Sequence, residues 1–179
     1  MRLTDPLEGI VPVHKLGHVG HRTHLLEETE SFYTTHFNFK PSDFLTAPDG
    51  TTFIIFLHID LGKKYSDHHS FFLARDSASG PHHTAFEVDG IDNQFIAHDQ
   101  LLKRGYKSYW GVGRHTEGSQ VFDYWYDIDG FILEHYTDGD LVNQDTPVGT
   151  MSIQRDRNNN WGPEFDTSNL LLKDMLSES

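Results

Sequence analysis

The sequence predicts an α+β fold built from two modules that share one element order, strand–helix–strand–strand–strand. Each of two stretches begins with a short strand pattern that carries a histidine near its start. Each then shows apolar residues at helical spacing, followed by three further strand patterns. When His18 is aligned with His83, the two stretches lie 65 residues apart, which suits two fused modules better than a short solenoid repeat. We expect a single domain over residues 1–140, with modules at about 15–75 and 80–140.

The first module opens with KLGHVGHRT at 15–23. The residues that follow place apolar and aromatic side chains at intervals of three and four, which predicts a helix from about Leu25 to Phe37. FKPSDFLTAP (39–48), TTFIIFLHID (51–60) and HSFFLAR (69–75) are then expected to be strands, because they are rich in aromatic and β-branched residues.

The second module opens with GPHHTAFEV at 80–88 and repeats the pattern. Ile91, Phe95, His98 and Leu102 fall at helical spacing, and Gly105 is a plausible helix stop. YKSYWGV (106–112), SQVFDYWYDID (119–129) and FILEHYT (131–137) are the three expected strands.

Residues 141–179 differ from both modules. TPVGTMSIQRDRNNNWGPEF is rich in turn formers, and DTSNLLLKDMLSES predicts a short helix capped by Asp166 or Ser168. We expect this tail to pack on the domain, to close a site, or to join a partner chain.

Composition narrows the classes of function. The chain is 36% hydrophobic and 13% aromatic, as expected of a globular protein, and its formal net charge of −13 argues against a nucleic-acid partner. No apolar run approaches the ~18 residues that span a bilayer, and the N-terminus lacks a secretory pattern, so we expect no membrane partner and a cytoplasmic location. The absence of cysteine excludes disulfides, thiolate zinc sites and thiol nucleophiles.

The thirteen histidines raise the question of a metal site, and His18, His83 and Glu134 are the candidate ligands. The two histidines occupy equivalent places in the two modules, so pseudo-symmetry brings them together where the modules meet. Glu134 lies in an apolar strand, where a carboxylate is costly unless a positive group meets it. Two neutral imidazoles and one carboxylate are typical of non-haem Fe(II) sites that keep open coordination positions.

The turn at Asp129-Gly130 decides which residue faces Glu134. A two-residue loop places Trp125 opposite Glu134. A three-residue loop over 128–130, with Gly130 left-handed, places Tyr124 there instead. Residues that pair across strands point to the same face of the sheet, and we favour the second register because it brings Tyr124 beside the candidate metal site.

Each of these residues also has a structural explanation. A lone histidine at a strand start is more often a hydrogen-bonded packing residue than a ligand. Glu134 alone could pair with a lysine, and Tyr124 alone could belong to the core. The residue pattern therefore leaves the metal and the reaction open.

The segment GRHTEGSQVFDYWYDIDGFILEHY (113–136) resembles the signature of type I extradiol ring-cleaving dioxygenases, members of the vicinal oxygen chelate superfamily. KLGHV, GPHHTAFEV and DHHSFFLA resemble the family's metal-histidine strands and its active-site histidine segment, so the resemblance covers roughly 15–140. Two positions of the signature depart from the family pattern, namely Asp123 and Ile128. The matching positions are His115, Tyr124, Asp127, Gly130 and Glu134.

The resemblance implies that the two modules form an open barrel-like mixed sheet around a metal site. It implies Fe(II), with Mn(II) as the alternative, a catechol-type aromatic substrate together with O2, and a homo-oligomer. His83 is chosen over His82 because HisThrAlaPhe aligns with HisValGlyHis in the first module, and His68 remains the alternative to His69. The implied roles are metal ligation by His18, His83 and Glu134, acid/base chemistry by His69, and substrate contact by His115 and Tyr124.

Two other functions remain open at this point. A metal-dependent glyoxalase-like isomerase or epimerase would use the same fold with a carboxylate base. A non-catalytic small-molecule-binding protein of the bleomycin-resistance kind would lack the metal-binding residues.

Overall fold

A computed structural model describes residues 11–152 and 159–164 of the chain. The described part holds two helices, α1 (Leu26–His36) and α2 (Gly90–Lys103). Its strands are β1 (Val13–Thr23), β2 (Phe39–Thr46), β3 (Thr52–Ile59), β4 (Ser66–Asp67), β5 (Phe71–Arg75), β6 (Gly80–Val88), β7 (Ser108–His115), β8 (Val121–Tyr126), β9 (Ile132–Thr137), β10 (Leu141–Val142), β11 (Gly149–Ser152) and β12 (Asn159–Trp161).

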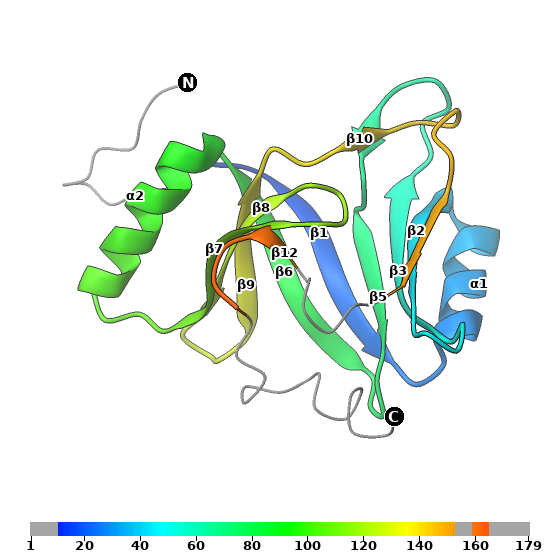
Figure 1. The fold of residues 1–179 in the computed structure, drawn as a ribbon, viewed down its shortest axis with the longest axis horizontal. Coiled ribbons are helices and arrows are strands. Elements are labelled where there is room, and N and C mark those ends of the chain that lie inside the picture. Colours follow the sequence, from blue (N-terminus) through cyan, green and yellow to red (C-terminus); the bar gives the residue numbers. More distant parts are fainter. Residues whose placement is uncertain (1–10, 153–158, 165–179) are drawn as a thin grey trace.

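Ten of these strands form one mixed sheet, in the order β11-β2-β3-β5-β1-β6-β9-β8-β7-β12. The long strands β1 and β6 pair antiparallel at its centre, where the two modules meet. Each central strand pairs in parallel with the last strand that its own module contributes to the sheet, β1 with β5 and β6 with β9. This arrangement, visible in Figure 1, confirms the predicted α+β fold of two strand–helix–strand–strand–strand modules.

The sheet curls, as its two edges show. β11 forms one edge and β12 forms the other, yet only six residues separate Ser152 from Asn159 along the chain. A chain of that length reaches at most about 25 Å. A flat sheet of ten strands would measure about 43 Å across. The edges therefore face each other across an open, concave side, while α1 and α2 lie on opposite outer sides in Figure 1.

Side chains of alternate residues build a core on each face of the first module. Ile55 and Leu57 of β3 face outward and pack with Leu26 of α1. Phe56, between them in sequence, faces the concave side and packs with Phe72 of β5. The concave side near β3 and β5 is therefore aromatic.

The second helix is fastened to the sheet by a buried amide. Gln94 of α2 is fully buried, and its Nε2 donates to the backbone oxygens of Val121 (2.9 Å) and His135 (2.8 Å). Gly105, predicted to end this helix, has a φ of +81°, a conformation that favours glycine. The helix therefore holds β8 and β9 in a fixed relation to each other.

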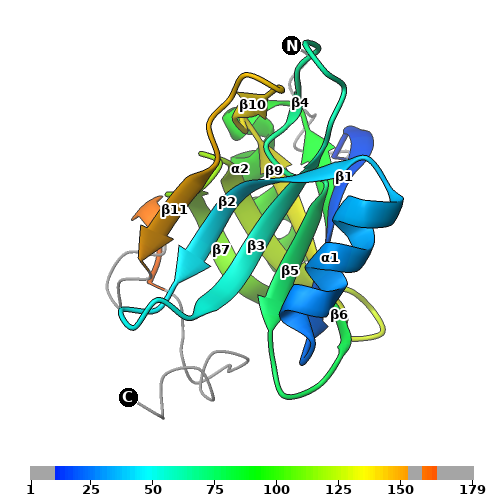
Figure 2. The same cartoon turned by 90° about the vertical axis from the view of Figure 1, so that its right-hand side faces the viewer.

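Three short strands come from the residues after 140. β10 pairs with β4, β11 pairs in parallel with β2, and β12 pairs with β7. Figure 2 shows β11 lying along β2 at one edge of the sheet. The helix predicted near Asp166 or Ser168 lies outside the described residues. Within the described ranges, neither helix has the length and hydropathy needed to cross a bilayer.

Candidate metal centre

Three adjacent strands, β1, β6 and β9, bring His18, His83 and Glu134 to one point. Nε2 of His18 lies 2.9 Å from Nε2 of His83 and 3.0 Å from Oε2 of Glu134. Nε2 of His83 lies 3.5 Å from the same oxygen. One potential ligand atom from each residue falls within 4.8 Å of the others, and all three side chains are buried. The structure thus places the three predicted ligands around one small volume.

The electrostatics of this cluster suit a cation. Both carboxylate oxygens of Glu134 are buried, and neither makes a hydrogen bond of good geometry with the described residues, although Oε2 lies near two imidazole nitrogens. Burial, helped by the nearby His82 and His18, holds the pKa of His83 well below its usual value, so that this imidazole is neutral. An orphaned buried carboxylate that faces two imidazoles is a donor set that fits Fe(II) or Mn(II).

The β8–β9 hairpin has the predicted three-residue loop. Asp127 N donates to Phe131 O at 2.9 Å, and Gly130 has a φ of +85°. Tyr124 consequently lies directly opposite Glu134, which confirms the register favoured from the sequence. The side chain of Asp127 accepts hydrogen bonds from the backbone of the loop and so stabilises this turn.

The two departures from the family signature have structural explanations. Ile128 is 90% exposed at the tip of the loop, so the residue type there does not alter the register. Asp123 is fully buried, and its Oδ1 lies 2.9 Å from Nδ1 of His98 on α2, while Oδ2 accepts from Trp125 Nε1 at 2.7 Å. Burial raises the pKa of Asp123, and the hydrogen bond with Asp123 raises that of His98.

His115 and Tyr124 contact each other beside the cluster. Nε2 of His115 lies 2.9 Å from the Tyr124 hydroxyl and 4.0 Å from Oε1 of Glu134. Burial and the negative charge of Glu134 hold the pKa of Tyr124 well above its usual value, so its hydroxyl stays protonated. The structure thus brings these two predicted substrate-contacting residues to the edge of the metal cluster.

His69 is the member of the double-histidine segment that contacts the cluster. Its ring centroid lies 4.2 Å from that of His18 and 4.8 Å from that of Phe56. Burial, with the neighbouring His18 and His68, keeps the pKa of His69 well below the usual value for histidine. His68 is equally buried, but its Nε2 points to Asp43 at 2.6 Å, away from His18.

An aromatic wall beside His115 and Tyr124 was missed from the sequence. The ring of Trp110 lies 4.1 Å from that of Phe122 and stacks on Tyr124 at 5.8 Å. The ring of Phe122 also stacks on His115 at 4.2 Å. The alternation of β8, which puts Phe122 and Tyr124 on one face, was the signal that could have found this wall.

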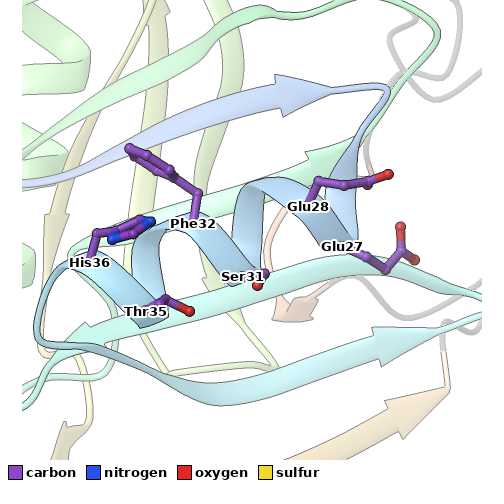
Figure 3. A pocket seen from close by; sticks show the side chains of 6 residues that line it. All are labelled: Glu27, Glu28, Ser31, Phe32, Thr35 and His36. Atoms are coloured by element: carbon purple, nitrogen blue, oxygen red, sulfur yellow. The ribbon is translucent and has the colours of Figure 1, made fainter.

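A separate surface hollow, drawn in Figure 3, lies on the outer side of α1 and includes none of the residues discussed above. It is open to solvent and is formed by a single helix, so it does not extend the metal centre. Its lining residues are Glu27, Glu28, Ser31, Phe32, Thr35 and His36.

Known proteins resemble this chain in sequence and in fold. The chain is 32% identical over 152 residues to Metapyrocatechase 2 of Cupriavidus necator, which covers 84% of this chain and 45% of that protein. The fold is similar to the Mn(II)-bound glyoxalase from Novosphingobium aromaticivorans, with a TM-score of 0.77 and 23% identity over 93% of this chain and 52% of the other. It is also similar to homoprotocatechuate 2,3-dioxygenase from Brevibacterium fuscum, in complex with 3,4-dihydroxyphenylacetate, with a TM-score of 0.74 and 21% identity over 87% of this chain and 48% of that one.

The chain spans about half the length of these relatives. The family model described as the glyoxalase/bleomycin resistance protein/dioxygenase superfamily matches residues 15–135, which include His18, His83 and Glu134. That match takes in both modules of the sheet, and the predicted resemblance is thereby confirmed. The chain belongs to the glyoxalase/bleomycin resistance protein/dioxygenase superfamily.

Proposed function

We propose that this protein is an Fe(II)-dependent extradiol dioxygenase, which cleaves a catechol-type aromatic ring with O2. One observation carries the proposal: a buried carboxylate without a good hydrogen bond faces two imidazoles, with His69, His115 and Tyr124 around it. The relationship to Metapyrocatechase 2 supports the ring-cleavage reaction. His18, His83 and Glu134 would hold the metal, with Mn(II) as the alternative ion.

When bound, the metal supplies Lewis acidity that favours a catechol monoanion, and it gathers the two reactants at one point. A dication with one glutamate ligand leaves a net charge of +1, which a monoanionic substrate neutralises. The protein shields the metal site from water, because the three ligand side chains are all buried. In such a setting charge interactions are stronger than in water.

The residues around the metal site would bind the substrate and transfer protons. Tyr124 keeps its proton and donates a hydrogen bond to a substrate oxygen, and His115, whose Nε2 lies 2.9 Å from that hydroxyl, contacts the substrate beside it. His69 takes up and returns the proton that the ring-opening steps move, because it adjoins His18 and starts in its neutral form.

The aromatic wall of Trp110 and Phe122 suits a planar substrate. Aromatic rings favour offset-stacked or edge-to-face contact with one another, and the wall adjoins the two residues that would contact substrate oxygens. A catechol ring lying against this wall would direct its hydroxyl groups toward Tyr124 and the metal ligands.

The fold shared with a Mn(II)-bound glyoxalase supports a second candidate, a metal-dependent isomerase or epimerase. That chemistry would need a carboxylate base beside the metal. The side chains that adjoin the triad in the described structure include His69, His115, Tyr124, His82 and Tyr136, none of which is a carboxylate. We therefore rank ring cleavage first.

Anaerobic loading with Fe(II), followed by O2 uptake against a panel of catechols, tests the proposal. The expected result is O2 uptake with a yellow ring-cleavage product, supported by iron and to a lesser degree by manganese. Isomerase activity toward thiohemiacetals without O2 uptake would favour the second candidate. Catechol binding without turnover under any metal would favour a non-catalytic binding protein.

A further inference from the structure

A chain of hydrogen bonds leads from His69 away from the metal cluster. Nδ1 of His69 lies 3.0 Å from Nδ1 of His68, and Nε2 of His68 lies 2.6 Å from Oδ2 of Asp43. Both imidazoles are 4% exposed, whereas the side chain of Asp43 is 17% exposed. This series of hydrogen bonds thus runs from the buried ring of His69, beside His18, to a carboxylate that is partly exposed to water.

The carboxylate of Asp43, at the solvent end of these hydrogen bonds, determines which atom is the donor in each of them. An ionised carboxylate only accepts hydrogen bonds, so Nε2 of His68 must carry the proton shared with Asp43. In this tautomer of His68, Nδ1 carries no proton and accepts from the Nδ1–H of His69. His69 is thereby held with its other nitrogen, Nε2, unprotonated and able to accept a proton.

We propose that Asp43 and His68 form a proton relay that fixes the tautomer of His69 and connects this residue with solvent. The inference rests on the proposed function, because it concerns the residue that exchanges protons with the substrate there. Asp43 and His68 act through His69 and are positioning residues, since neither contacts the metal ligands.

Each transfer in the relay conserves protons and charge. A proton from a substrate hydroxyl binds Nε2 of His69, and the Nδ1 proton of His69 passes to Nδ1 of His68. The Nε2 proton of His68 then passes to Oδ2 of Asp43, which releases it to water. The reverse sequence returns a proton to the reaction, so His69 can serve as base and then as acid without being exposed to solvent itself.

The backbone around His68 holds the relay in place. Ser42 Oγ donates to the backbone oxygen of His68 at 2.6 Å, and the backbone N–H of His68 donates to the oxygen of Asp140 at 2.9 Å. A Cβ atom at Gly118, whose φ is +66°, would lie 2.7 Å from Nδ1 of His68. Glycine at 118 therefore lets the β7–β8 connection approach the ring that links the two ends of the relay.

The C-terminal segment packs against Asp43, the solvent-facing end of the relay. Gly149 of β11 pairs with Asp43 of β2, and a Cβ atom at 149 would lie only 2.0 Å from Oδ1 of Asp43. His18, His83 and His115 interact electrostatically with His69 at the inner end of the relay. His58 on β3 and Glu117 after β7 interact in the same way with His68. Burial raises the pKa of Glu117, and the charge of Asp43 raises it further.

The tautomers can be measured in the wild-type, metal-free protein. Long-range proton–nitrogen correlation spectra of 15N-histidine-labelled protein should show His68 protonated on Nε2 and His69 protonated on Nδ1. Replacement by Asp43→Asn should weaken the Nδ1 preference of His69. A wild-type His69 protonated on Nε2 would overturn the relay, and this result needs no variant to fold and no turnover to be seen.

Kinetics of the iron-loaded enzyme test the transfer itself. By analogy with other outer-shell partners, Asp43→Asn and His68→Ala should lower kcat by about 10- to 100-fold, with iron content and the KM for catechol little changed. Added imidazole should restore part of the rate of His68→Ala. The matched control is Asp60→Asn, since Asp60 has a similar exposure of 19% but bonds to Lys40 outside the relay.

The outcomes separate the relay from the proposed function. Wild-type turnover combined with kcat values of both variants within about twofold of it would overturn the relay and leave the dioxygenase intact. A wild-type protein that takes up no O2 would overturn the proposed function, and the spectra would still decide whether Asp43 and His68 fix the tautomer of His69.

Discussion

Replacing Glu134 with glutamine should stabilise the metal-free protein and abolish its response to metal. The carboxylate is fully buried, and its two oxygens make no hydrogen bond of good geometry with the described residues. An unsatisfied buried polar group costs about 1–3 kcal/mol, and a charged one more. Glutamine has nearly the same shape without the charge, so Glu134→Gln should raise the free energy of unfolding of the apo-protein by about 2 kcal/mol.

Metal should stabilise the wild type and leave the stability of Glu134→Gln almost unchanged. A ligand at about 1,000 times its dissociation constant stabilises a folded protein by about 4 kcal/mol. For a chain of this size 1 kcal/mol corresponds to about 2–4 °C in Tm. The wild type should therefore gain about 8–16 °C with saturating metal, whereas Glu134→Gln should start about 4–8 °C higher and gain almost nothing.

The assay is thermal unfolding of chelator-treated protein, followed by anaerobic titration with Fe(II) and, separately, with Mn(II). The alternative is that Glu134 forms a structural ion pair with His18, whose Nε2 lies 3.0 Å away. Breaking a buried ion pair costs about 3–5 kcal/mol. A loss of stability of that size in metal-free Glu134→Gln, with no metal-dependent shift in the wild type, would refute the assignment of a metal site.

Three further predictions test other parts of the molecule. His69→Ala should retain iron, measured by metal analysis, but lose most of its turnover, and a full ring-opening rate in this variant would contradict its assigned role. Tyr124→Phe should lower kcat with iron retained, because the hydroxyl that lies 2.9 Å from His115 Nε2 is lost; an unchanged kcat would contradict substrate contact by this residue. His98→Leu should destabilise the protein by about 3 kcal/mol at pH 7, since it leaves the buried Asp123 carboxylate without its imidazole partner. Because the hydrogen bond with Asp123 raises the pKa of His98, the wild type has the full stability of this pair below the pKa of unfolded histidine and loses it as pH rises through the raised pKa. The loss in the variant should therefore shrink as pH rises from 7 toward 9, as urea unfolding at both pH values would show. Equal losses at the two pH values would contradict this reasoning. The control is Lys103→Met, which removes an exposed ion pair with Asp99 on the same helix and should cost at most about 1 kcal/mol of stability.

The sequence carried enough information to predict the hairpin that faces Glu134. Loop length and a glycine able to adopt a positive φ decide the register, and both are local properties. Tyr124 accordingly pairs with Glu134 as expected. The module repeat likewise predicted that His18 and His83 would lie side by side, because equivalent strands pair about the centre of the sheet.

The relay could not be predicted in this way. Asp43 and His68 are 25 residues apart and meet only because β2 and the segment before β5 both flank β3. The pairing of β11 with β2 was also unforeseen, since four residues are too few to show a period and a parallel partner leaves no turn signal. The partnership of Asp123 with His98 depends on how α2 packs against β8, which sequence spacing alone does not fix.

The strands donated by the C-terminal segment have a consequence for how copies of the chain behave toward one another. Without them the sheet would end in β2 and β7, each eight residues long and open to pairing with a neighbouring chain. With them it ends in strands of four and three residues, which offer little to pair with. A protein truncated after residue 140 would therefore expose two long edge strands with unpaired backbone groups. Its tendency to aggregate would rise even if the metal ligands stayed in place.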